Sequence, residues 1–202
     1  PTMLIIGTGG LAKDIAGNIS SHYDQEQYVF YNDANVLDES LFLGRYRVLT
    51  SKSEAANFFD KVDKKFITAI GNPMMRMRVN KSFKELGGVL ESFTFTEPKY
   101  ISAFTKIGKG SVIQYNVIIS SNTFLGEGNF INCGCIIGHD VTIADYVSLG
   151  PGVHILGNVS IGEYSYIGTG VILMPGVAIG KKVRIAPGKI ISEDIPDNSK
   201  IV

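Results

Sequence analysis

The sequence predicts a small α/β domain over residues 1–97, followed by a prism of hexapeptide repeats over residues 98–202. Two observations carry this prediction. Expected strands and helices alternate over the first hundred residues, and an aliphatic residue returns at every sixth position from Ile101 to Ile191. The alternation is typical of a parallel sheet, whereas a period of six fits neither an α-helix nor a plain strand.

Short apolar segments that end in glycine or polar residues predict the strands of the first domain. The first strand, residues 3–7, leads through the turn GTGG into a helix with Leu11, Ile15 and Ile19 on one side. The other expected strands are residues 28–33, 45–50, 65–72 and 89–95, and the other expected helices are residues 53–62, capped by Ser53, and residues 73–87.

The repeat runs through sixteen positions without a break in phase. These positions are Ile101, Ile107, Ile113, Ile119, Leu125, Ile131, Ile137, Ile143, Leu149, Ile155, Ile161, Ile167, Leu173, Ile179, Ile185 and Ile191. We expect each hexapeptide to form one face of a triangular prism, with its aliphatic side chain inside. Three hexapeptides then close one coil, and about five coils stack at roughly 4.8 Å each. The loops of a β-sandwich vary in length and would break this phase.

Glycine directly follows the aliphatic residue in many of the hexapeptides, as at Gly138 and Gly168. We expect these glycines to adopt turn dihedrals that a β-carbon would forbid. Small or β-branched residues at the fifth place would pack where the interior of the prism narrows.

Composition disfavours several partners. The chain has 19 Lys+Arg and 19 Asp+Glu, so it offers no basic field for nucleic acid or an anionic membrane. No apolar run approaches the roughly 20 residues of a membrane span. The opening residues lack the charged segment of a signal peptide, so we expect a cytoplasmic protein. Cys133 and Cys135 are too close in sequence for a disulfide, and their spacing is not that of a zinc site, so no metal is expected.

Candidate binding residues lie at the carboxyl ends of the expected parallel strands, where ligands bind to such sheets. They are Gly9, Gly10, Leu11, Asn32, Asp33, Gly71 and Asn72. GTGGLA fits the dinucleotide fingerprint, and Asp33 stands where a ribose-binding acid belongs, which would indicate NAD. A glycine-rich turn before a helix also binds other phosphates, or is purely structural. Because the domain is small for a dinucleotide fold, we favour a nucleotide-sugar phosphate.

His139 and Asp140 are the candidate catalytic residues. His139 is expected at a turn, where its imidazole can project outward and take a proton near neutral pH. The adjacent carboxylate can hold the ring in the required tautomer. The alternative is a solvated surface pair. His154 could line the same groove or be a solvated corner residue, and His22 falls near the end of the first helix.

With the repeat and the segment IGHD established, the chain resembles the hexapeptide-repeat acyltransferases that have a left-handed parallel β-helix. More narrowly, it resembles the bacterial sugar acetyltransferases of the PglD/NeuD type. The segments GTGGLAKD, YND, AIGN, GHD, DYV and DIPDNSKIV stand in the order of that family. The resemblance implies a Rossmann-like domain that binds a nucleotide-linked amino sugar, and acetyl transfer from acetyl-CoA to its amine. The alternatives are O-acetylation of sialic acid or another sugar hydroxyl, and a non-catalytic nucleotide-sugar-binding trimeric scaffold.

The resemblance also implies roles for individual residues. His139 would be the general base in a direct attack without an acyl-enzyme, and Asp140 would raise its basicity. Backbone amides such as that of Gly157 would hold the thioester oxygen. Each site would lie between two subunits of a homotrimer. The family usually has a histidine where this chain has Leu11, and commonly has another at Ser148. The residues expected near acetyl-CoA are Ser148, Gly157, Thr169 and Pro187.

Overall fold

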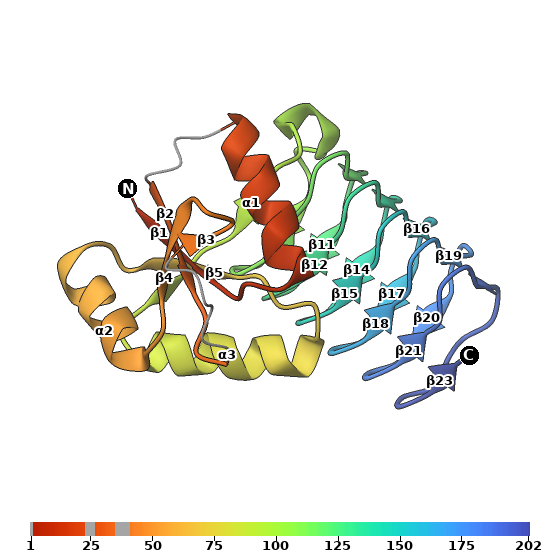
Figure 1. Ribbon diagram of the computed structural model, residues 1–202. Helices are drawn as coiled ribbons and strands as arrows, with labels where there is room; N and C mark the ends of the chain where they lie inside the picture. The colour runs from red at the N-terminus through yellow and green to blue at the C-terminus, as the bar shows by residue number, and fades with distance from the viewer. Residues whose placement is uncertain (1, 23–26, 35–40) are drawn as a thin grey trace. The chain divides into compact units, whose positions relative to one another are not determined.

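The computed structural model describes residues 2–22, 27–34 and 41–202 (Figure 1). The chain forms two compact units. The first comprises Pro1–Gly71 and Met75–Glu91, and the second comprises Asn72–Met74 and Ser92–Val202. The domain boundary expected after residue 97 stays a prediction, because compactness alone does not show which part of a chain folds by itself.

The first unit is an α/β domain built on one sheet with the strand order β3-β4-β2-β1-β5-β6. Only the β3–β4 pair is antiparallel among these described strands. Helix α1 covers one face of the sheet, and α2 and α3 cover the other (Figure 1). The bounds are β1 Met3–Ile6, α1 Gly10–His22, β2 Tyr28–Tyr31, β3 Leu41–Phe42, β4 Tyr46–Leu49, α2 Lys52–Lys61, β5 Lys65–Thr68, α3 Pro73–Glu85 and β6 Val89–Leu90.

Aromatic and aliphatic side chains fill the core of this domain. Leu4 and Ile6 of β1 join the apolar cluster formed with α2 and α3, and Ile5 between them is buried on the opposite face. Phe59 of α2 and Phe83 of α3 both contact the ring of Phe66 on β5, with centroids 5.8 and 5.9 Å away. These contacts fix both helices against the sheet.

Two details of the first hundred residues differ from expectation. The N-cap of α2 is Ser51 rather than Ser53, because Ser51 and Glu54 form a reciprocal capping box. The strand expected over residues 89–95 is two strands. β6 belongs to the α/β sheet, whereas Phe93–Thr94 pairs with Val112–Ile113 inside the second unit.

The second unit is a left-handed parallel β-helix whose sheets form the three faces of a prism. Strands β10-β13-β16-β19-β22 form the first face, β20-β17-β14-β11-β8 the second, and β23-β21-β18-β15-β12-β9-β7 the third. The bounds are β7 Phe93–Thr94, the 3₁₀ helix Pro98–Tyr100, β8 Lys106–Ile107, β9 Val112–Ile113, β10 Ile118–Ile119, β11 Phe124–Leu125, β12 Phe130–Ile131, β13 Ile136–Ile137, β14 Thr142–Ile143, β15 Ser148–Leu149, β16 His154–Ile155, β17 Ser160–Ile161, β18 Tyr166–Ile167, β19 Ile172–Leu173, β20 Ala178–Ile179, β21 Arg184–Ile185, β22 Ile190–Ile191 and β23 Lys200–Ile201.

The strand register confirms the coil of three hexapeptides. Ile137 pairs with Ile119 before it and with Ile155 after it, and each partner is the aliphatic residue of the third hexapeptide along the chain. The predicted aliphatic positions from Ile113 to Ile191 are buried in one continuous core. Ile107, near the first coil, is 38% exposed.

The glycines that follow the aliphatic residues serve a different purpose from the one expected. Left-handed backbone occurs at every sixth residue from Gly110 to Gly188. In each hexapeptide this position lies two residues after the one that directly follows the aliphatic residue. Gly138 has no such φ; instead, a β-carbon there would lie 2.9 Å from the backbone nitrogen of Gly157. The expectation about turn dihedrals is therefore wrong for these glycines, which allow the next coil to approach closely.

Candidate active site

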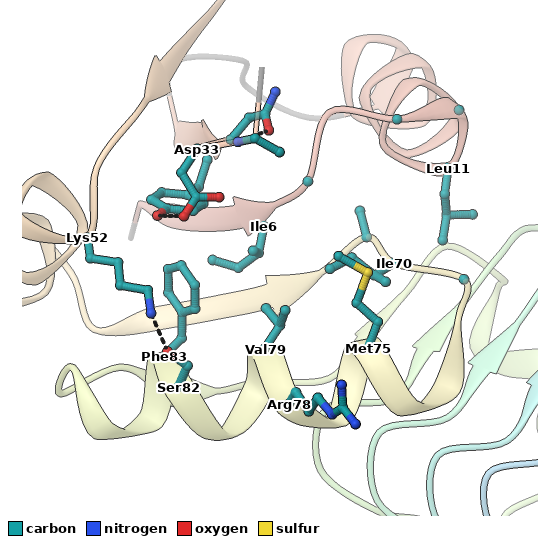
Figure 2. Close-up of a pocket in the computed structure, with 18 residues that line it drawn as sticks. Ile6, Leu11, Asp33, Lys52, Ile70, Met75, Arg78, Val79, Ser82 and Phe83 are labelled. Atoms are coloured by element: carbon teal, nitrogen blue, oxygen red, sulfur yellow. Dashed lines mark hydrogen bonds between the residues drawn. The ribbon is translucent and has the colours of Figure 1, made fainter. Parts of the chain in front are cut away.

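The α/β domain contains a pocket of about 620 Å³ at the carboxyl ends of β1, β2 and β5 (Figure 2). This volume is in the range of small-molecule sites. In Figure 2, Asp33 and Lys52 lie toward one end of the pocket, and Leu11, Ile70 and Met75 lie toward the other. Arg78 of α3 also lines the pocket and lies near Met75 in Figure 2, so the pocket has a charged side chain toward each end.

The glycine-rich turn brings the N-terminus of α1 to this pocket. Gly7 has a φ of 115°, and a β-carbon there would lie 3.0 Å from the carbonyl oxygen of Ala69. Gly7, Gly9 and Gly10 line the pocket, and α1 begins at Gly10. The free amides and dipole of a helix N-terminus favour an anionic group such as a phosphate.

Asp33 follows β2 and turns its carboxylate toward the sheet. The buried Tyr31 hydroxyl donates to Asp33 Oδ2 at 2.9 Å. Burial, and then this hydrogen bond, raise the pKa of Tyr31 well above its usual range. The phenol therefore stays a donor, which leaves the other carboxylate oxygen to accept from a ligand hydroxyl.

Residues on α2 and α3 complete the pocket, although the sequence analysis did not select them. Lys52 donates from Nζ to Ser82 Oγ at 3.2 Å. The fully buried Arg76 donates to the carbonyl oxygens of Ile70 (2.7 Å) and Gly71 (3.2 Å) and so holds the loop after β5. The lining residues of α3 recur at helical spacing, which is the signal that could have found them: Met75, Arg78, Val79, Ser82 and Phe83.

The structure brings most of the expected binding residues together. Those that line the pocket are Gly9, Gly10, Leu11, Asn32, Asp33 and Gly71. Asn72 is exposed and is not part of the described lining.

On the β-helix, His139 and Asp140 meet at the corner between the first and second faces. His139 Nδ1 lies 2.6 Å from Asp140 Oδ2, and the two side chains are 64% and 43% exposed. A carboxylate only accepts, so Nδ1 carries the hydrogen and Nε2 of the neutral ring keeps its lone pair. Among the described residues, Nε2 has no hydrogen-bond partner. The pair can therefore accept a proton from a ligand.

Gly157 lies one coil beyond His139 at the same corner. A β-carbon at this position would lie 2.7 Å from both Cε1 and Nε2 of His139, so the ring occupies the space that any side chain would fill. The Gly157 N–H has no hydrogen-bond partner among the described residues. This position thus combines room for the imidazole with a free backbone donor beside it.

Asn122 lies one coil before Asp140 and was not selected from the sequence. Its Nδ2 donates to Asp140 Oδ1 at 2.6 Å. This hydrogen bond first, and the one from His139 second, hold the pKa of Asp140 below its usual range. The signal that could have found Asn122 is its position, because it occupies the place equivalent to Asp140 three hexapeptides earlier.

The residues expected near acetyl-CoA are not all placed with His139. Thr169 and Pro187 are exposed at another corner, between the third and first faces. Ser148 on β15 is 2% exposed, so its side chain is not open to a ligand, contrary to expectation. His154 is not a corner residue but lies within β16, paired with Ile136 and Ile172 on the first face.

The described parts of the chain offer few other reactive or metal-binding groups. Burial raises the pKa of the Cys135 thiol to about 12, which makes it a poor nucleophile. Within residues 2–22, 27–34 and 41–202, no three His, Cys, Asp or Glu side chains cluster as metal ligands would. None of the described helices has the length and apolar character needed to cross a bilayer.

Comparison with known families and structures agrees with this arrangement. Residues 2–83 match the PglD N-terminal domain, and residues 122–157 and 158–193 match the bacterial transferase hexapeptide family. The acetyltransferase domain of PglB from Neisseria gonorrhoeae is 27% identical, with 98% of this chain and 95% of that chain covered and a TM-score of 0.86. Its structure with acetyl coenzyme A is also similar, at 26% identity, 98% and 94% coverage and a TM-score of 0.82.

Two further structures share the fold. A mutant of perosamine N-acetyltransferase from Caulobacter crescentus, in complex with CoA and GDP-perosamine, is 23% identical, covers 99% of this chain and 92% of that chain, and has a TM-score of 0.85. WeeI from Acinetobacter baumannii AYE is 23% identical, with 98% and 95% coverage and a TM-score of 0.77. No curated protein sequence matches the chain.

The β-helix of bacterial transferase hexapeptide repeats, together with the similar acetyltransferase structures, identifies the chain as a hexapeptide-repeat acyltransferase. The PglD-type domain, which precedes the β-helix in the chain, indicates a subgroup of these acyltransferases. The chain thus combines a PglD-type N-terminal domain with bacterial transferase hexapeptide repeats, and it is similar to the acetyltransferase domain of PglB.

Proposed function

We propose that this protein transfers the acetyl group of acetyl-CoA to the amine of a nucleotide-linked amino sugar. The observation that carries the proposal is the His139–Asp140 hydrogen bond, which leaves Nε2 free at an exposed corner of the β-helix. The similar structures that hold acetyl coenzyme A, or CoA with GDP-perosamine, support this pair of substrates.

In the proposed reaction, the neutral amine attacks the thioester carbonyl while Nε2 of His139 takes one of its protons. Asp140 stabilises the imidazolium that forms. The Gly157 N–H would donate to the oxygen of the tetrahedral intermediate. When the intermediate collapses, the amide bond remains, the C–S bond breaks and the imidazolium returns the proton to the leaving thiolate. No acyl-enzyme is required.

The pocket of the α/β domain would hold the nucleotide sugar. The N-terminus of α1 at Gly10 and Leu11 suits its phosphates. Asp33 would accept a hydrogen bond from a ribose hydroxyl at the other end of the pocket, which Lys52 also lines.

Acetyl-CoA would lie between two β-helices of a homotrimer. His139 and Gly157 lie at one corner of the prism, and Thr169 and Pro187 at another. When two chains face each other, residues from two different corners can contact the same ligand, because each chain contributes one of its corners. In this arrangement the base and the CoA-binding corner come from different subunits.

The test is release of free thiol from acetyl-CoA in the presence of UDP-, dTDP- or GDP-linked amino sugars, or of free sialic acid. We expect release with one of the nucleotide-linked acceptors. Release only with sialic acid would favour O-acetylation. Binding of a nucleotide sugar without any release would favour a non-catalytic scaffold.

His139→Ala should lower kcat by about 10²–10⁴, the usual contribution of a general base. His139→Asn should be equally impaired, because it keeps a polar side chain but removes the base. Circular dichroism should show the fold unchanged in both variants. A loss smaller than tenfold would remove His139 from the mechanism.

A further inference from the structure

Asp140 is held from two sides. One carboxylate oxygen accepts from His139 within the same turn, and the other accepts from Asn122 in the preceding coil, both at 2.6 Å. The register that stacks β11 on β14 therefore also determines where the catalytic carboxylate points.

The backbone alone does not explain this contact. Asn122, Asp140, Asn158 and Gly176 occupy equivalent turns at the same corner, and all have left-handed φ values, from 57° at Asn122 to 78° at Gly176. Asparagine suits such a turn for its backbone. The side chain of Asn158, however, forms no hydrogen bond to any described residue, whereas that of Asn122 donates to Asp140. The two asparagines share a conformation and differ in their partners.

The hydrogen bond from Asn122 to Asp140 is important because the His139–Asp140 pair is exposed. His139 and Asp140 are both open to solvent, so water competes for the carboxylate and its side chain could otherwise rotate away from the ring. A donor from another coil restricts that rotation. His139 is the titratable group that acts on Asp140, while Asn122 is neutral and donates whatever the protonation state of the ring.

We propose that Asn122 is a positioning residue for acetyl transfer: by holding Asp140 Oδ1, it keeps Oδ2 on Nδ1 of His139 and so keeps Nε2 aimed outward. This inference rests on the proposed function, because it assigns Asn122 a part in the work of the same base. In this proposal Asn122 acts through Asp140 and not on a substrate.

The experiment compares Asn122→Gly with Asn158→Gly. Glycine occupies the equivalent turn at Gly176, so both changes keep the backbone and remove one carboxamide from the same corner. Asn122→Gly should lower kcat by about tenfold, the loss expected for one hydrogen bond to a charged group, with KM unchanged for both substrates. Asn158→Gly should retain wild-type kcat. Asn122→Asp, which has the same shape but only accepts, should not restore activity.

A second measurement does not depend on turnover. In carbon-13 NMR, with the Asp140 resonance assigned from Asp140→Asn, the pKa of Asp140 should rise in Asn122→Gly and stay unchanged in Asn158→Gly. Full kcat in Asn122→Gly would overturn the inference, and so would an unchanged Asp140 titration. A wild-type protein that transfers no acetyl group would overturn the proposed function instead, and the titration would still decide whether Asn122 holds Asp140.

Discussion

Adjacent residues seldom cooperate on an extended backbone, because their side chains point to opposite sides. His139 and Asp140 escape this restriction because Asp140 has a φ of 59°. Aspartate and asparagine tolerate the left-handed region better than most residues. The turn that changes the direction of the coil therefore also folds the carboxylate back onto the imidazole.

Replacing Asp140 with asparagine should affect stability in a pH-dependent way. The folded-state pKa of Asp140 is lowered, so its contribution is present above the unfolded-state pKa and is lost as pH falls through the folded-state value. The difference in unfolding free energy between wild type and Asp140→Asn should thus be largest near neutral pH and vanish in acid. Urea denaturation over a pH series measures it. A difference that grew on acidification would contradict the assignment.

Gly157→Ala should impair catalysis by displacing the imidazole. The added methyl group would lie 2.7 Å from His139 Nε2, so the ring must move. A misplacement of the base by about 1 Å can cost about a hundredfold in kcat, so we expect a loss of this order. Steady-state acetyl transfer by the variant measures the loss.

A double-mutant cycle provides the control for this prediction. If Gly157→Ala acts through the ring, then adding it to His139→Ala should cost little more activity. Losses that multiply in the double variant would mean that Gly157 acts independently of His139.

The sequence predicted part of this site and missed another part for a physical reason. A histidine and a carboxylate side by side at a turn are visible as IGHD. Asn122 is remote along the chain, and its role depends on a carboxamide that points along the prism toward Asp140 rather than into solvent. Asn158 has the same spacing and the same turn, yet no such contact to a described residue, so position in the repeat identifies candidates but not partners.

At the scale of elements, the β-helix is built from strands of only two residues, too short to be stable in isolation. Their stability comes from the stacked interior, where each aliphatic side chain contacts equivalents in neighbouring coils. Because one period governs every strand, the sequence predicted this unit well. In contrast, Lys52 lines the pocket because of the way α2 packs onto its sheet, and no short-range pattern specifies that packing.

Replacing Ile137 with progressively smaller side chains tests how much the interior of the β-helix contributes to stability. Its side chain is fully buried in the middle of the stack. Ile137→Val should lower the unfolding free energy by about 0.5–1.5 kcal/mol and Ile137→Ala by about 2–5 kcal/mol, because the larger deletion leaves a cavity between coils. Denaturant unfolding with a constant m-value measures both. Equal costs for the two variants would indicate that the interior collapses around the lost atoms.

At the scale of the whole molecule, the proposed site needs more than one chain. His139 and Thr169 belong to different corners of the prism, and the corner of Thr169 would face the base of a neighbour. The coil of three hexapeptides expected from the sequence already specifies which turns share a corner, and the strand register confirms it. The sharing of the site between two chains is implied only by the family resemblance and stays a prediction.

Subunit complementation tests the shared site. His139→Ala removes the base, and Thr169→Trp should block acetyl-CoA, so each protein alone should be inactive. Chains mixed at random in trimers should recover about a quarter of the wild-type sites, because a quarter of the interfaces then combine two intact corners. Sedimentation should give three times the 21.9 kDa chain mass. No recovery in verified mixed trimers would place the whole site within one chain.

The regular left-handed turns have a consequence for how this protein can change in length. Duplication or deletion of three consecutive hexapeptides leaves every remaining aliphatic residue of the six-residue repeat on its own face of the prism, whereas an insertion that is not a multiple of six residues must be absorbed at a turn. Near its end the chain departs from this rule, since Arg184 pairs with Lys200, and the segment between them is shorter than three full hexapeptides. Gain or loss of a complete coil is therefore the change in the length of the β-helix that disrupts its interior least.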